Sequence, residues 1–161
     1  MAKKAKEEKT NVMRLLEQAK VEYKHYSYAN TDAISGVEVA EVLGQNVDKV
    51  FKTLVTVGKS GEHYVFVVPV AEELDLKKAA KAVGEKSVEM LHVKEITKVT
   101  GYVRGGCTAI GMKKQFPTVI DESACTQKLI YVSGGKIGMQ IRLKPDDLKK
   151  AANAEYAAIT F

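Results

Sequence analysis

Cysteines are few, and long apolar runs are absent from this sequence of 161 residues. The two cysteines, Cys107 and Cys125, have neither CxxC spacing nor a paired histidine for a zinc site. No apolar stretch approaches the roughly 20 residues that a membrane-spanning helix needs. The start, MAKKAKEEK, is too polar for a secretory signal. We therefore expect a cytoplasmic, reduced protein without metal or cofactor, in which residues 1–10 form a flexible basic tail.

Common catalytic motifs are also missing. The chain has no GxSxG, HExxH or GxGxxG motif, and its histidines (His25, His63 and His92) are scattered. The spacing of Gly106 and Gly111 resembles the start of a phosphate-binding P-loop. The lysine that follows is displaced by one position, however, and no serine or threonine comes after it to hold magnesium. A site that hydrolyses nucleotides is therefore not expected.

What the sequence does contain is an alternation of helix and strand patterns, in a chain long enough for one domain with a core. Apolar periodicity and capping residues predict helices near 11–19, 35–43 and 75–83, a short one within 93–99 and a last one from Pro145. Ser35 and Glu38 are expected to form a capping box, and Leu76 is expected on the inward face of the third helix. Residues 50–57 and 63–70 are predicted to form a hairpin, and three more strands are predicted at 116–121, 128–133 and 139–143, with a possible edge strand at 154–161. These patterns favour a single α+β domain on a mixed, mostly antiparallel sheet.

Two glycine-rich loops follow strand-like segments. The first lies within YVRGGCTAIGMKKQFPTVID (102–121) and the second within YVSGGKIG (131–138). Glycines let successive backbone N–H groups converge on an oxygen or phosphate, and a nearby lysine adds a positive charge. One such loop is usually only a turn. Because there are two such loops, a binding site for an anion or a carbonyl is about as probable as two simple turns.

Six segments carry a resemblance to a known family. FKTLV (51–55), DLKKAAKAVG (75–84), VEM (88–90), TGYVRGG (100–106), GMKK (111–114) and YVSGGKIG (131–138) occur in the order and spacing of the YbaK/EbsC family of aminoacyl-tRNA deacylases. This family is similar to the editing domain of bacterial prolyl-tRNA synthetases. The resemblance covers residues 11–161 and implies a curved mixed sheet flanked by helices. It also implies trans-editing that releases cysteine from Cys-tRNA(Pro), on the 3′-terminal adenosine of the tRNA.

The resemblance implies roles for particular residues. Lys52 corresponds to the key lysine of the family and is expected to bind the terminal phosphate or the ester carbonyl. The substrate-binding residues that the resemblance implies are Tyr28, Gly105, Gly106, Thr108, Gly111, Ser133, Gly134, Gly135 and Gln140. The nucleophile is expected to be the thiol of the substrate cysteine or a water molecule, because relatives need no strong nucleophilic side chain. Cys107 is therefore not expected to attack the ester.

Two departures from the family pattern leave alternatives open. Thr108 and Ala109 stand where relatives carry serine and proline, and Gln140 stands where close relatives often carry aspartate. The substrate could then carry another small amino acid, such as alanine, because pockets discriminate small apolar side chains only modestly. The chain could also be a binding module for tRNA or nucleotides without catalytic activity, or a protein that docks on prolyl-tRNA synthetase.

Overall fold

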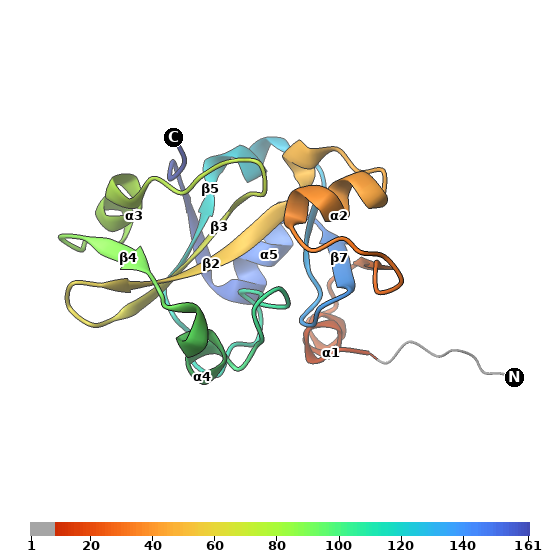
Figure 1. Cartoon of the computed structure of the whole chain (residues 1–161), viewed down its shortest axis with the longest axis horizontal. Coiled ribbons are helices and arrows are strands. Elements are labelled where there is room, and N and C mark those ends of the chain that lie inside the picture. Colours follow the sequence, from red (N-terminus) through yellow and green to blue (C-terminus); the bar gives the residue numbers. More distant parts are fainter. Residues whose placement is uncertain (1–8) are drawn as a thin grey trace, which may run out of the picture.

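Two β-sheets with helices packed around them make up the part of the chain that the computed structural model describes, residues 9–161 (Figure 1). Most of the predicted basic tail, residues 1–8, lies outside these described residues. The helices are α1 (Asn11–Gln18), α2 (Gly36–Val42), α3 (Leu76–Val83), α4 (Ile96–Thr100) and α5 (Pro145–Ala152), with 3₁₀ turns η1 (Val47–Lys49), η2 (Val93–Glu95) and η3 (Glu122–Thr126). The strands are β1 (Lys24–Ser27), β2 (Phe51–Gly58), β3 (His63–Pro69), β4 (Val88–Met90), β5 (Thr118–Asp121), β6 (Ile130–Ser133), β7 (Met139–Leu143) and β8 (Ala154–Ala157).

The larger sheet has the strand order β4-β2-β3-β5-β8 and the smaller one the order β1-β7-β6. Pairing is antiparallel between β2 and β3, β2 and β4, β1 and β7, and β6 and β7, whereas β5 pairs in parallel with both β3 and β8. An isolated parallel bridge between Val50 and Tyr131 connects the sheets. The predicted α+β fold with mostly antiparallel pairing is confirmed, and the strands form two sheets where one was expected.

Local signals placed most helix ends correctly. The Thr10 hydroxyl accepts a hydrogen bond from the Met13 N–H at the start of α1. Ser35 and Glu38 form the predicted capping box at the start of α2, and Asp75 accepts from two backbone N–H groups at the start of α3. Such caps satisfy N–H groups that have no partner within the helix. The boundaries of these helices therefore follow from short sequence motifs.

Other expectations differ from the structure. The predicted inward position of Leu76 in α3 is wrong, because Leu76 is 39% exposed and the helix packs mainly through Ala79 and Ala80. Strands β1 and β4 were not predicted, because their sequences, KHYS and VEM, are short and largely polar. Strand β8 lies at the edge of the larger sheet, as expected. Within residues 9–161, every helix is too short or too polar to span a bilayer.

Within residues 9–161, part of β2 has no strand on one side, and this unpaired edge positions the site. Strand β4 pairs only with Thr56–Gly58, and beyond it the Leu91 N–H still reaches the Val55 carbonyl at 2.9 Å. Residues 51–54 are therefore paired with β3 on one side only, apart from the neighbouring bridge at Val50. An unpaired strand edge presents backbone N–H and C=O groups to whatever lies beside it.

Candidate active site

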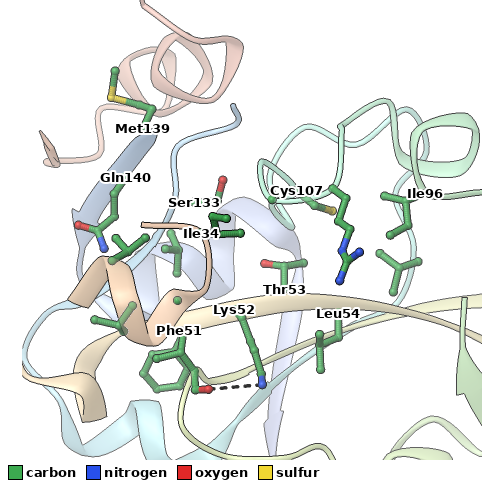
Figure 2. Close-up of a pocket in the computed structure, with 18 of the residues that line it drawn as sticks. Ile34, Phe51, Lys52, Thr53, Leu54, Ile96, Cys107, Ser133, Met139 and Gln140 are labelled. Atoms are coloured by element: carbon green, nitrogen blue, oxygen red, sulfur yellow. Dashed lines mark hydrogen bonds between the residues drawn. The ribbon is translucent and has the colours of Figure 1, made fainter. Parts of the chain in front are cut away.

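A cavity of about 370 Å³ lies along this unpaired part of β2 (Figure 2). Helices α2 and α4, the two glycine loops and the start of β7 contribute to its walls. The lining residues are mainly apolar, with a few polar and charged groups, as in many small-molecule sites. They are Tyr28, Ile34, Gly36, Val39, Val50, Phe51, Lys52, Thr53, Leu54, Val55, Val70, Met90, Leu91, Val93, Ile96, Arg104, Gly105, Cys107, Val132, Ser133, Met139 and Gln140.

The backbone of Thr53 faces the cavity side of β2. In an antiparallel pair, alternate residues bond to the partner strand and the residues between them point the other way. The Val70 N–H donates to the Val50 carbonyl at 2.8 Å, and the Gly58 N–H donates to the Glu62 carbonyl at 2.8 Å, so the even-numbered residues of β2 bond to β3. The N–H and C=O of Thr53 then lie on the unpaired side. Sequence reasoning did not identify Thr53, because no local motif shows which strand edge stays free.

Lys52 lines the same cavity, and its side chain leaves β2 on the opposite side from that of Thr53 (Figure 2). Its Nζ donates to the Val70 carbonyl at 3.4 Å and lies 3.6 Å from a carboxylate oxygen of Glu73. The Lys52 side chain is 31% exposed, and Glu73 is largely exposed. Both contacts are long for an ammonium group that has three protons to donate. Lys52 is therefore held in place and can still donate to a ligand.

The cavity gathers half of the residues predicted for the site. Lys52, Tyr28, Gly105, Ser133 and Gln140 line it, although they come from segments far apart in the sequence. The other half do not line it: Gly106, Thr108, Gly111, Gly134 and Gly135.

Three of those glycines allow close packing of the loops. A Cβ on Gly106 would lie 2.8 Å from the Lys136 Cα, where the two glycine loops touch. A Cβ on Gly135 would lie 2.7 Å from Val12, and one on Gly111 would lie 2.7 Å from Leu15, both in α1. These contacts are shorter than van der Waals packing allows, so only glycine fits without a shift. The glycine pattern therefore reflects the packing of the loops on each other and on α1.

Gln140 is buried in the wall of the cavity and already has a partner. Its amide nitrogen donates to the Gln45 side-chain oxygen at 2.9 Å, and its oxygen accepts from the Gln45 amide at 2.7 Å. Gln140 is only 3% exposed. The pair joins the segment after α2 to β7 with neutral groups. Sequence reasoning missed Gln45, which is 95 residues away along the chain.

The chemistry of the lining residues provides no activated protein nucleophile. Burial raises the pKa of the Cys107 thiol to about 11, although a hydrogen bond with Thr100 lowers it in part. The thiol is therefore protonated at neutral pH, and the thiolate is the reactive form. None of the three histidines lines the cavity. Residues 9–161 contain no cluster of His, Cys, Asp or Glu that could hold a metal ion.

Solved structures share this fold. A crystal structure provisionally described as a trans-editing enzyme for prolyl-tRNA synthetase is 26% identical, with a TM-score of 0.80 over 94% of this chain and 98% of that one. The crystal structure of a hypothetical protein, APE2540, is 21% identical, with a TM-score of 0.85 over 93% of this chain and 99% of that one. The architecture is thus that of a YbaK-type editing domain.

The chain belongs to the aminoacyl-tRNA editing domain family, whose sequence model matches residues 31–151. It is also 53% identical to EbsC of Enterococcus faecalis, over 99% of this chain and 98% of that protein. The name of EbsC provisionally assigns it Cys-tRNA(Pro)/Cys-tRNA(Cys) deacylase activity. The family resemblance seen in the sequence and the predicted enzyme class, an aminoacyl-tRNA deacylase, are confirmed at this level.

Proposed function

We propose that this chain is a trans-editing deacylase that releases cysteine from Cys-tRNA(Pro). The observation that carries the proposal is a largely apolar cavity that places a lysine ammonium beside an unpaired strand edge and has no activated protein nucleophile. Membership of the editing family and the similarity to EbsC support the same activity. The substrate is an aminoacylated tRNA, and its 3′-terminal adenosine with the attached ester enters the cavity.

The reaction needs hydrogen-bond donors more than it needs a side-chain base. Attack on the ester carbonyl carbon places negative charge on the carbonyl oxygen, and fixed donors in a site shielded from water stabilise that charge. The Lys52 ammonium and the backbone N–H of Thr53 are donors at the cavity wall. Gly105, Ser133 and Tyr28 also line the cavity. In this proposal these residues orient the ester.

The nucleophile comes from the substrate or from solvent. In one route the thiol of the esterified cysteine forms a bond to its own carbonyl carbon. The ester C–O bond then breaks, the thiol proton passes to the ribose oxygen, and water opens the resulting thiolactone. In the other route water attacks directly. Because the raised pKa keeps the Cys107 thiol protonated and unreactive, it supports both routes over attack by this side chain.

Deacylation of proline tRNA charged separately with cysteine, alanine and proline tests the proposal. We expect cysteine to be released fastest, because its side chain is small and brings a thiol. Preferential release of alanine would support deacylase activity but change the assigned amino acid. Pocket size alone discriminates side chains that differ by a methylene by only roughly 10- to 200-fold. Binding of the tRNA end without any hydrolysis would contradict the proposal and favour a non-catalytic binding module. Docking on prolyl-tRNA synthetase stays a prediction.

A further inference from the structure

The charges around the cavity are unbalanced. Among residues 9–161, two cationic residues line it, Lys52 and Arg104, and no aspartate or glutamate does. Lys52 has the Val70 carbonyl and the Glu73 carboxylate nearby. Arg104 is exposed, and within residues 9–161 its side chain makes no hydrogen bond or ion pair. Arg104 is thus a cavity-lining residue whose guanidinium donors are free for an anion.

The loop that carries Arg104 is fixed on both sides. The Gly106 N–H donates to the Val103 carbonyl at 2.9 Å and closes a turn around Arg104. Gly106 also packs against the backbone of the second glycine loop. After this turn, Thr108 is buried. A charged side chain on a fixed loop loses less conformational entropy when it binds a ligand than one on a mobile loop.

The mouth of the cavity is apolar as well as cationic. Ile34 is 87% exposed, and Met90 and Val93 are each about half exposed, yet all three line the cavity. A cavity lined by both exposed apolar side chains and a free cation suits a ligand that combines flat apolar surface with negative charge. The single-stranded end of an RNA has both, since its bases pack on apolar surfaces and its phosphates pair with arginine.

We propose that Arg104 binds the phosphodiester that precedes the terminal adenosine, which leaves Lys52 to the aminoacyl ester. This inference rests on the proposed function, because it takes the ligand to be the acceptor end of a tRNA. An aminoacyl ester itself carries no negative charge, so the phosphodiester one nucleoside away is the nearest anion in that ligand. A guanidinium can bind two phosphate oxygens at once, whereas an ammonium acts as a point charge.

A binding comparison without turnover tests Arg104. The probes are the dinucleotide cytidylyl-adenosine and its methylphosphonate analogue, which has the same shape and a neutral linkage. Calorimetric titration of the wild type is expected to give about 10- to 100-fold tighter binding of the charged probe. Arg104→Ala should abolish this difference, and Arg104→Lys should restore part of it. Arg14→Ala, which removes an exposed arginine that does not line the cavity, should keep the full difference.

Two results would overturn the inference. One is a wild type that binds both probes equally. The other is an Arg104→Ala protein that keeps the wild-type preference for the charged probe, which would assign the phosphate to Lys52 or to another group. Deacylation of charged tRNA is measured separately, so a failure of the proposed activity is distinguishable from a failure of Arg104 to bind phosphate. Circular dichroism of each variant confirms that it is folded.

Discussion

Cys107 is the residue in the cavity that most resembles a nucleophile, and its surroundings argue against that role. It lines the cavity in the glycine loop, but burial holds the pKa of its thiol at about 11. Since the folded-state pKa lies above the ordinary value, the neutral thiol is the stable form through the physiological range. At the scale of single residues, reactivity therefore depends on desolvation as much as on position.

We expect Cys107→Ala to retain deacylation within about threefold of the wild type, because a neutral thiol contributes packing and no attack. The rate profile from pH 6 to pH 8.5 should be the same for both proteins, since the Cys107 thiol does not ionise in that range. Cys125→Ala serves as the control, because Cys125 is exposed and lies outside the cavity. A folded Cys107→Ala protein with no activity beside an active Cys125→Ala protein would show that the thiol takes part.

At the scale of elements, the site is assembled by contacts between segments that are distant in the sequence. The reciprocal pair of Gln45 and Gln140 connects the end of α2 to β7. Close contacts at Gly106 and Gly135 fix the two glycine loops against each other and against α1. These contacts set the separation of the cavity walls, and each can be broken by one substitution.

Gln45→Ala should destabilise the fold by about 1–3 kcal/mol, because it leaves the buried Gln140 amide without its partner. Gln140→Leu should destabilise the fold less than Gln45→Ala does, since it removes the buried polar group itself. Urea unfolding of both single variants and the double variant gives the coupling energy between the two side chains. Strictly additive effects would show that the two amides do not stabilise each other.

Gly135→Ala should be more destabilising than Gly84→Ala. Both glycines have a positive φ, 99° and 75°, so alanine is strained at either position. A Cβ at Gly84 meets nothing within 4 Å, whereas one at Gly135 lies 2.7 Å from the buried Val12. We expect an additional cost of about 1–3 kcal/mol at Gly135 from overpacking. Equal shifts of the urea midpoint would show that backbone conformation alone requires Gly135.

At the scale of the whole molecule, the local part of the fold could be predicted from the sequence, and the long-range part could not. The Ser35–Glu38 capping box and the hairpin of β2 and β3 depend on neighbours in the chain, and both are confirmed. The free edge of β2 depends on how short β4 is, and the partner of Gln140 is 95 residues away. No local pattern encodes such pairings. The role of Lys52 was reached only through the family resemblance and stays a proposal.

Lys52 is central to the proposed activity of the whole molecule, because it is the cation beside the strand edge where the ester is proposed to bind. The most direct test is the single-turnover rate of cysteine release from Cys-tRNA(Pro) by wild type, Lys52→Ala and Lys59→Ala. Lys59 is an exposed lysine in the turn after β2 and does not line the cavity. We expect Lys52→Ala to lose about 100-fold or more of the rate, as when one donor to an oxyanion is removed. Lys59→Ala should match the wild type. A folded Lys52→Ala protein that releases cysteine at the wild-type rate would contradict the account.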